Sequence, residues 1–412
     1  MKKQVVFLII LALSVSGHAV LAQLNMVGFH FKSPRKTRLE IPFELYNNLI
    51  VVPVRINELD TLNFVLDTGV GYTLITDPGV RQSLGLTCYR QVKVAGAGTE
   101  QELLGCVTNV RQIELEGIRA FNHNLIILEE DVLNLSRYAG IKIHGLLGFD
   151  IFSRFVVRIN YVSQRVIFYH PENYQHRGRG EKIPIQIEHM KPYVVAEAEL
   201  AAGHTQVKLV LDTGAGHSLS LDPGAHPNIQ IPKIFVSSNL GMTLNGSVKG
   251  AIGRIHRFKL GSFEMEKVIT AFPDSNSLNL IRQITERQGN VGCGVLRRFH
   301  LTFNYPQETL ILKPNRLFKT PFEFNTSGID LVADPPRYKT FRVGAIRTHS
   351  PAEEAGLRPG DVIVAIDQHV ASQLRITQAY HLLNKKKNQT TSLLVQRNGK
   401  MLVFELMLQE PI

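Results

Sequence analysis

The chain has 412 residues, 44% of them hydrophobic and 20% charged, which is enough material for about three folded domains. Its formal net charge is +11, but Lys and Arg are spread along the chain and form a compact run only at 385–387. No aromatic residues interleave with this run, so nucleic-acid binding is not expected. After the N-terminal region, no segment of the sequence is long and apolar enough to span a membrane.

The first residues have the pattern of a secretory signal peptide. Lys2 and Lys3 give a positive start, and small or aliphatic residues precede Gln23. The apolar core between them has about 11 residues, shorter than the roughly 20 that a bilayer span requires. We therefore predict a signal peptide at 1–22 and an exported protein, periplasmic or extracellular. A membrane anchor is the alternative.

Residues 37–315 favour a body made mainly of β-strands. Runs of apolar, β-branched residues alternate with Gly-rich turns, and helical periodicity is rare. The clearest strands are predicted at 49–56, 61–66, 194–200 and 207–211. Residues 170–182 are rich in charge and Gly, so we expect them to link a first lobe at 37–171 to a second lobe at 181–315.

One segment of the chain occurs twice. Residues 65–79 and 210–224 share 10 identities in 15 positions, including Leu-Asp-Thr-Gly and a closing Asp-Pro-Gly. The repeated Asp67 and Asp212 are 145 residues apart, and the Gly-Leu-Leu-Gly and Gly-Asn-Val-Gly turns that follow them are 144 apart. Because these intervals keep nearly the same length, we predict two copies of one compact lobe of about 130 residues.

A β-hairpin is expected about 25 residues after each Asp-Thr-Gly motif. The first, at 92–117, has Gly96, Ala97 and Gly98 at its tip, and the second, at 236–261, has the same length.

The chain has three cysteines, too few for a disulfide framework or a zinc cluster. Cys88 and Cys106 lie in one predicted lobe and can pair after export, but buried thiols are the favoured prediction. Cys293 is expected near the active site, with no His placed to activate it as a nucleophile. The 15 His residues include no His-Glu-x-x-His pair, so neither a metal site nor another cofactor is expected.

The repeated motifs resemble the catalytic loops of aspartic peptidases of the pepsin and retropepsin superfamily. The resemblance covers nearly all of residues 37–315 and includes the apolar turn at 145–148. Val70 and Ala215 follow the motifs where pepsins have Ser or Thr, a detail closer to retropepsins, which have Ala. The resemblance implies two duplicated acid-protease-like β lobes, a bilobal cleft formed within one chain, and a monomer. A flap that covers substrate falls at the position of the two hairpins in that family, so each is either such a flap or an ordinary surface hairpin. Residues 96–98 are our candidates for a flap that binds substrate.

The chemistry of the motif is that of a catalytic carboxyl pair. Two neighbouring carboxylates cannot both ionise, so Asp67 and Asp212 are expected to share one proton and to activate water against a peptide bond. Glycines allow the two loops to approach closely, and the threonine hydroxyls can hydrogen-bond between the loops. The predicted supports of the dyad are Thr68, Gly69, Thr213 and Gly214.

The chain changes character after about residue 319. Residues 350–363 read Ser-Pro-Ala-x-x-Ala-Gly-Leu-x-x-Gly-Asp-x-Ile, and a helix at 375–383 and two strands are predicted to follow. This string resembles the PDZ domains of bacterial exported proteins, which implies an α+β domain at 325–412 that binds peptide C-termini. By position, the predicted peptide-binding residues are Lys339, Thr340, Phe341 and Val343.

The sequence therefore predicts an exported aspartic endopeptidase that acts on protein or peptide substrates, with a PDZ domain for peptide or partner binding. The alternative is a catalytically inactive, peptidase-like scaffold that acts through its PDZ domain. Both Asp-Thr-Gly motifs are intact, which favours the enzyme. The absence of Ser or Thr after them keeps the alternative open.

Overall fold

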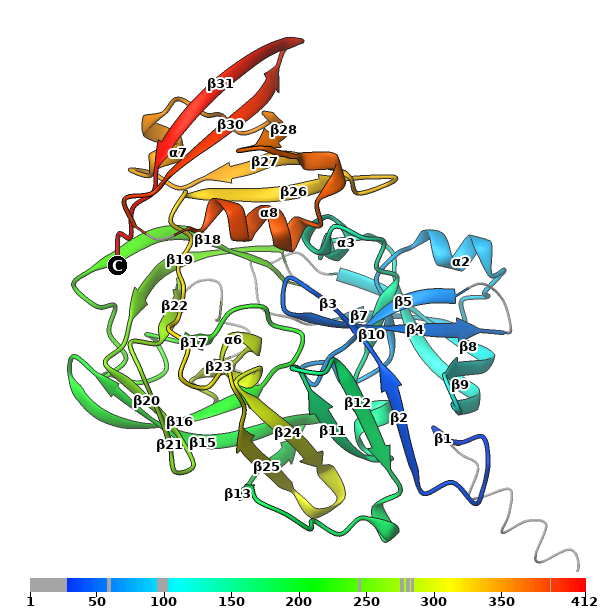
Figure 1. Ribbon diagram of the computed structural model, residues 1–412. Helices are drawn as coiled ribbons and strands as arrows, with labels where there is room; N and C mark the ends of the chain where they lie inside the picture. Colours follow the sequence, from blue (N-terminus) through cyan, green and yellow to red (C-terminus); the bar gives the residue numbers. More distant parts are fainter. Residues whose placement is uncertain are drawn as a thin grey trace, which may run out of the picture.

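The computed structural model describes residues 28–412 except 58–60, 95–102, 244–245, 275–277, 279–281, 283–284 and 386. The predicted signal peptide therefore lies outside the described residues. The protein is 49% strand and 11% helix, so the predicted β architecture is confirmed. Figure 1 shows two β lobes side by side, a sheet between them at the base, and a smaller domain above.

The first lobe is built on one mixed sheet with the order β1-β9-β6-β10-β5-β4-β8-β7, in which β3 pairs with β4. Its strands are β1 (His30–Phe31), β3 (Glu44–Tyr46), β4 (Leu49–Ile56), β5 (Thr61–Leu66), β6 (Leu74–Ile75), β7 (Arg90–Val94), β8 (Leu103–Leu115), β9 (Ile118–Leu128) and β10 (Gly145–Leu147). Three short helices accompany them: α2 (Gly79–Ser83), α3 (Leu135–Ala139) and α4 (Phe149–Phe152). The predicted strands 49–56 and 61–66 coincide with β4 and β5.

The second lobe repeats this plan, with the order β18-β19-β22-β17-β23-β16-β15-β20-β21 and β14 paired with β15. Its elements are β14 (Gln186–Glu188), β15 (Lys191–Leu200), β16 (Gly203–Leu211), β17 (Leu219–Leu221), β18 (Phe235–Thr243), β19 (Gly246–Arg254), β20 (Arg257–Leu260), β21 (Phe263–Glu266), β22 (Ile269–Pro273), β23 (Gly289–Val291) and α6 (Cys293–Leu296). In both lobes the strand before the Asp-Thr-Gly motif pairs in parallel with the strand of the later Gly turn.

A third sheet joins the lobes, with the order β13-β25-β24-β11-β12-β2. It combines β2 (Arg38–Pro42), β11 (Val156–Asn160) and β12 (Arg165–Tyr169) with β13 (Glu181–Pro184), β24 (Phe299–Asn304) and β25 (Thr309–Pro314). At its centre β11 and β24 pair antiparallel across the lobe boundary. One continuous apolar core runs through both lobes and this sheet, so the two Asp-Thr-Gly loops stand on a shared support.

The C-terminal domain has its own apolar core and a sheet with the order β26-β27-β28-β30-β31, in which β29 pairs with β28. Its elements are β26 (Ile329–Asp334), β27 (Thr340–Ile346), α7 (Pro351–Glu354), β28 (Val362–Ile366), β29 (His369–Val370), α8 (Ile376–Leu383), β30 (Thr390–Arg397) and β31 (Lys400–Met407). Ser350 caps α7 through its side chain, and Pro351 fits the first turn because that position needs no N–H donor.

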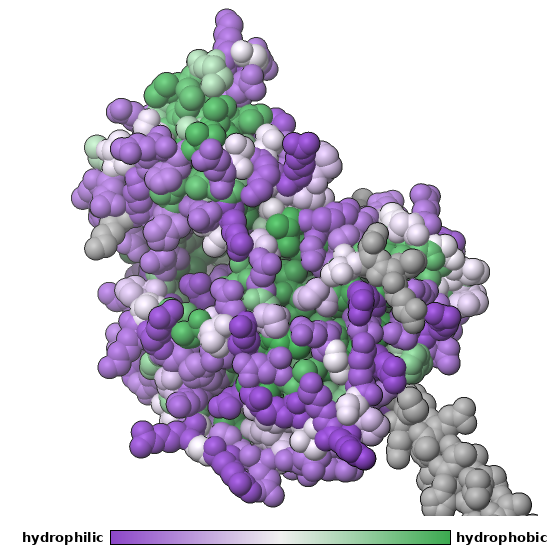
Figure 2. Space-filling view, turned by 45° about the vertical axis from the view of Figure 1, so that its right-hand side comes forward, coloured by the Kyte–Doolittle hydropathy of each residue, from purple (hydrophilic) through white to green (hydrophobic). Residues whose placement is uncertain are grey.

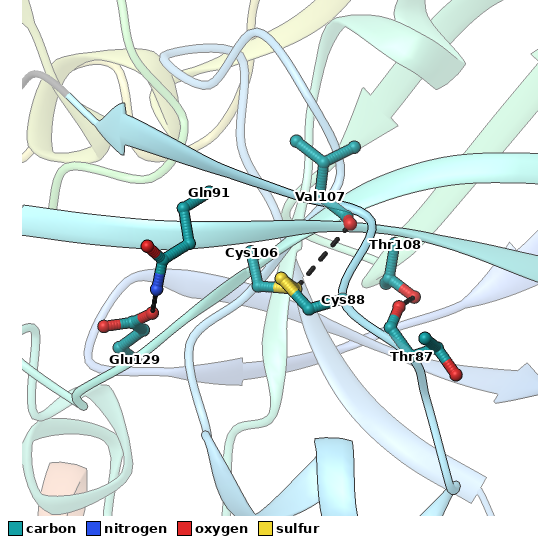
Figure 3. The surroundings of a disulfide bond; sticks show 7 residues. All are labelled: Thr87, Cys88, Gln91, Cys106, Val107, Thr108 and Glu129. Carbon is teal, nitrogen blue, oxygen red and sulfur yellow. Dashed lines mark hydrogen bonds between the residues drawn. A yellow bond between two sulfur atoms is a disulfide. The ribbon is translucent and has the colours of Figure 1, made fainter.

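The favoured prediction of buried thiols is wrong for two of the cysteines. Cys88 and Cys106 form a disulfide, with their Cα atoms 5.5 Å apart (Figure 3). The residues are only 18 positions apart, and the pairing of β7 with β8 sets Cys106 opposite Gln91, close to Cys88 in the chain. The hydrogen bond from the Thr108 hydroxyl to the Thr87 carbonyl, 2.7 Å, holds the same segments together. Cys293 is a free, buried thiol, as predicted.

Candidate active site

Asp67 and Asp212 stand at the ends of equivalent strands, β5 and β16. The backbone N–H of Asp67 donates to the Leu147 carbonyl at 2.8 Å, and that of Asp212 donates to the Val291 carbonyl at 2.9 Å. These carbonyls belong to β10 and β23, the strands of the repeated Gly turns. The two turns therefore fix the positions of the two acidic residues, which explains why turn and motif are duplicated together.

The two glycines bring the carboxyl groups together. The Gly69 N–H donates to Asp67 Oδ1 at 2.7 Å, and the Gly214 N–H donates to Asp212 Oδ1 at 3.0 Å. A Cβ placed on Gly69 would lie 2.9 Å from Asp212 Oδ1, and one on Gly214 would overlap the Asp67 carboxyl. Each glycine thus lies against the acidic side chain of the opposite lobe, and the two carboxyl groups lie close enough for the charge of Asp212 to act on Asp67.

The two threonines lock the loops to one another by reciprocal hydrogen bonds. Each Thr N–H donates to the hydroxyl of the other Thr, and both distances are 3.0 Å. The Thr68 hydroxyl donates to the Leu211 carbonyl at 2.6 Å, and the Thr213 hydroxyl donates to the Leu66 carbonyl at 2.9 Å. Both side chains are buried. The structure therefore brings together all six predicted residues of the dyad and its supports.

Burial gives Asp67 an unusual proton affinity. Its side chain is 8% exposed, and burial, followed by the charge of Asp212, raises the pKa of Asp67 to about 8. Asp67 therefore holds a proton at neutral pH, and a protonated carboxyl can donate to its neighbour.

The raised pKa of Asp67 predicts a specific dependence of stability on pH. Because this pKa rises from 3.8 unfolded to about 8 folded, the stability it contributes is full below about pH 4. This contribution is lost as the pH rises toward 8. Between pH 5 and 8 the free energy of unfolding of the wild type, measured relative to that of Asp67→Asn, should therefore fall by at least about 1.4 kcal/mol. This is the free energy that corresponds to a shift of one pKa unit. Urea unfolding of both proteins at several pH values measures this difference, and parallel curves would contradict it.

Two polar neighbours of Asp212 were not predicted from the sequence. The Asn290 side-chain amide donates to Asp212 Oδ2 at 3.2 Å. His217 lies beside Asp212 and Asn290, and burial lowers its pKa, which favours the neutral ring. In the first lobe the position of Asn290 is held by Leu146, which is buried in an apolar cluster. A polar residue inside an otherwise apolar turn was the available signal.

Near the dyad, one hairpin turn of each lobe reaches across to contact the other lobe. Asn48, between β3 and β4, donates its side-chain amide to the Gly216 carbonyl at 2.9 Å. At the equivalent turn of the second lobe, Met190 Cε lies 2.9 Å from a Cβ placed on Gly71. Each turn thus contacts the loop that follows the Asp-Thr-Gly motif of the other lobe. These contacts hold the two Asp-Thr-Gly loops from both sides.

Cys293 lies under the second Asp-Thr-Gly loop and therefore near the dyad, as expected from the sequence. Its thiol donates to the Thr213 carbonyl at 3.2 Å and lies 3.4 Å from the Tyr161 hydroxyl. Burial raises the pKa of the Cys293 thiol to about 12, so the thiolate does not form at neutral pH and Cys293 is no nucleophile. In the described part of the chain, no three His, Cys, Asp or Glu side chains gather as metal ligands would.

The two predicted hairpins are present as β7–β8 and β18–β19. The first tip, with Gly96, Ala97 and Gly98, lies outside the described residues. Its substrate-binding role therefore stays a prediction. Over the described ranges, no helix has the length and apolar character needed to cross a bilayer.

The peptide-binding residues predicted in the C-terminal domain lie on or beside an interior strand. Phe341 and Val343 are buried in β27, and β27 pairs with β26 on one side and β28 on the other. Lys339 and Thr340 lie where the β26–β27 turn meets β27. A peptide that adds to this sheet as a strand would instead need an outer strand, β26 or β31.

Of these two edges, β26 is already covered. The Tyr380 hydroxyl of α8 donates to the Leu331 carbonyl at 3.2 Å and accepts from the Leu331 N–H at 2.8 Å. Helix α3 of the first lobe packs on the same strand, and Arg137 forms an ion pair with Asp334 at 2.8 Å (Figure 1). At the other edge, β31 exposes Met401, Val403 and Met407, and Figure 2 shows apolar surface on this domain.

Fold and site together define a class of protein. It has two related β lobes, which bring their Asp-Thr-Gly loops together so that the two Asp carboxyl groups lie side by side, and a small α+β domain follows them. The comparisons with known families agree. The family model described as aspartyl protease matches residues 52–151 and 196–292, and the PDZ domain model matches residues 328–408. The chain is therefore a two-lobed aspartyl-protease-like protein with a C-terminal PDZ domain. A search of curated proteins finds no significant match.

Proposed function

We propose that this protein is an exported aspartic endopeptidase in which Asp67 and Asp212 act as one catalytic unit. The observation that carries the proposal is the reciprocal bonding of Thr68 and Thr213, which holds two carboxyl groups against each other. Placing two carboxyl groups side by side is unfavourable unless they share a proton. A body that served only as a scaffold has no need of such an arrangement.

The proposed reaction assigns one role to each carboxyl. Water gives a proton to Asp212 while the water oxygen attacks the peptide carbonyl carbon, and the Asp67 proton moves to the carbonyl oxygen. The resulting diol then collapses: the proton on Asp212 passes to the leaving nitrogen, the C–N bond breaks, and Asp67 regains a proton from the diol. The Asn290 amide supports this assignment, because it donates to Asp212 Oδ2 and so holds the orientation of that carboxyl group.

A cleavage assay tests this function. The purified mature chain should cut internal bonds of casein or of a peptide library, and a statine-type inhibitor should block the reaction. Because one chain supplies both carboxyl groups, we propose a monomer whose specific activity is unchanged by dilution. The scaffold alternative predicts no cleavage at any pH between about 3 and 8, where at least one carboxyl titrates.

Export is part of the proposal. It is supported by the N-terminal pattern and by the disulfide between Cys88 and Cys106, since disulfides persist in oxidising compartments outside the cytosol. N-terminal sequencing of protein recovered from a periplasmic or culture fraction should start at Gln23. A start at Met1 in the cytosolic fraction would contradict export.

We further propose that the PDZ domain binds a peptide end along β26 and that contacts with the first lobe compete with this binding. Gly140 after α3 packs on Ile376 of α8, and the Asn47 N–H donates to the Thr377 hydroxyl at 3.3 Å. Tyr138 of α3 also lies against Gly216, in the loop that follows Asp212. A peptide that displaces α3 from β26 would therefore also disturb a neighbour of the active site.

Arg137→Ala should strengthen the binding of an apolar C-terminal peptide by the full chain about twofold to fivefold. The variant removes a partly exposed ion pair that holds the first lobe on β26, and the fraction of open domain sets the apparent affinity. Fluorescence anisotropy with a labelled peptide measures the change. Arg81→Ala, at an exposed position of α2, is the control and should not alter it. Unchanged affinity in Arg137→Ala would contradict the competition.

A further inference from the structure

The duplication allows the two lobes to be compared position by position around the dyad. In the first lobe, four positions near Asp67 are filled by buried apolar residues of one cluster: Leu49, Val51, Ile143 and Leu146. Strand register maps each of them onto the second lobe. There the four positions carry polar or basic side chains: Lys191, Tyr193, Arg287 and Asn290. The lobes thus differ in chemistry at the positions that surround their acidic residues.

The register of β15 and β16 places this group beside Asp212. Tyr193 is opposite Val210, so continuing the antiparallel ladder by two residues places Lys191 opposite Asp212. Residues two apart on a strand share a face, and Lys191 and Tyr193 therefore lie on one side of the sheet. Arg287 leads into β23, which pairs with the other side of β16 and carries Asn290. Three strands thus bring these side chains to the dyad.

The basic members of the group form no ion pair among the described residues, although Asp212 is a neighbouring negative charge of both. Lys191 and Arg287 are both half-buried and form no hydrogen bond or ion pair there through their side chains. The nearby carboxylate of Glu188 is bound to Lys208 at 2.7 Å. Burial, followed by the neighbouring charge of Arg287, lowers the pKa of Lys191, and burial also lowers the pKa of Arg287. The cations are thus close to each other and poorly hydrated.

A buried hydroxyl completes the group. Tyr193 is 2% exposed, and its hydroxyl has no hydrogen-bond partner. Buried donors without acceptors are unfavourable, and partly buried charges that form no ion pair are more so. An anion that accepts from Lys191, Arg287 and Tyr193 would remove all of these costs at once. The first lobe avoids them with apolar residues, so the fold itself does not require this group.

We propose that Lys191, Arg287 and Tyr193 form a subsite beside the dyad that binds a carboxylate of the substrate. This inference rests on the proposed function and names its substrate class. The substrates are peptides that carry a carboxylate near the cleaved bond, either on an acidic side chain or at a free C-terminus. Both sources present the same carboxylate, which matches the planar guanidinium fork of Arg287. The subsite makes the second lobe the selective one.

Matched peptides test the subsite in two ways. One series carries Glu at successive positions and the other carries Gln, each with a free or an amidated C-terminus. Their affinities are measured by calorimetry on the Asp67→Asn chain, and their kcat/KM values on the active chain. Peptides with the carboxylate should be favoured about tenfold or more, since hydrogen bonds to charged groups are of that strength. Loss of the preference on amidation identifies the C-terminus as its source, and loss on Glu→Gln identifies the side chain.

Substitutions that copy the first-lobe residues into the second lobe provide the decisive comparison. Lys191→Leu with Arg287→Ile installs the first-lobe residues and should reduce the preference to within about twofold. Tyr193→Phe keeps the ring and should reduce it partly, which covers the case that the double variant does not fold. Lys233→Leu, at an exposed position of the second lobe, should leave it unchanged.

Two results would overturn the subsite: no preference in the wild-type sequence, or a preference that survives Lys191→Leu and Arg287→Ile. A Lys191→Leu variant with an altered pH profile but unchanged selectivity would also overturn it, by making Lys191 only a counter-charge of the dyad. Failure of the proposed function looks different. In that case the wild-type chain cleaves no peptide, while calorimetry on the Asp67→Asn chain still reports whether the carboxylate binds.

Discussion

Asp67→Asn and Asp212→Asn are each expected to reduce kcat at least about a thousandfold, because residues that act as one unit lose most of their effect together. Asparagine keeps the size of the side chain but can neither share the proton nor accept one from water. For the same reason the double variant should be little worse than either single one. Cleavage of a fluorogenic peptide by purified protein, with folding checked by thermal melting, measures all three.

Asp77→Asn is the matched control. Asp77 closes the first copy of the repeat, pairs with Lys142 at 2.8 Å and accepts from the Gly79 N–H at 3.1 Å. Asparagine can keep the turn contact, so this variant should retain activity. Loss of turnover in only one of the two dyad variants would contradict a shared proton.

Thr213→Val is expected to lower the free energy of unfolding by about 2–4 kcal/mol and to reduce activity strongly. Valine has nearly the same shape, but it leaves the Thr68 N–H and the Leu66 carbonyl buried without their partner. Each unsatisfied buried group costs about 1–3 kcal/mol. Activity falls as well, because the two loops are then no longer held in register. Urea unfolding and the peptide assay measure the two effects.

Two variants separate this effect from a general loss of stability. Thr213→Ser keeps the hydroxyl and should restore most of both properties. Thr270→Val removes a buried hydroxyl that donates only within its own lobe, to the Val268 carbonyl at 3.1 Å. It should cost about 1 kcal/mol and leave kcat unchanged. Normal activity in Thr213→Val would show that the reciprocal bonds do not position the dyad.

The sequence was enough to predict the double lobe and the residues at its centre. Asp67 and Asp212 were recognisable because the motif, its flanks and the later Gly turn recur at one spacing, which chance does not produce. The strands at 49–56 and 61–66 were predictable for a local reason, since β-branched residues between turns favour a strand. Such features depend on neighbours along the chain.

Features that depend on distant segments were not predictable. The bond between Cys88 and Cys106 requires the register of β7 and β8, which composition does not give. Strand order puts β26 at the edge of the C-terminal sheet, and strand order cannot be read from the sequence. The residues predicted to bind peptide therefore lie on or beside β27, an interior strand. Asn290 was visible as a polar residue in an apolar turn, but its bond to Asp212 requires the fold.

The dependence of kcat/KM on pH tests the shared proton most directly. For a peptide without titratable groups, we expect a bell-shaped profile with two apparent pKa values that belong to the pair. The upper limb should lie near pH 8, because the pKa of Asp67 is raised to about 8. The lower limb reports ionisation of the first carboxyl and the upper limb loss of the shared proton. A profile that stays flat from about pH 3 to 10, or rises in one step, would contradict a dyad that works with one proton.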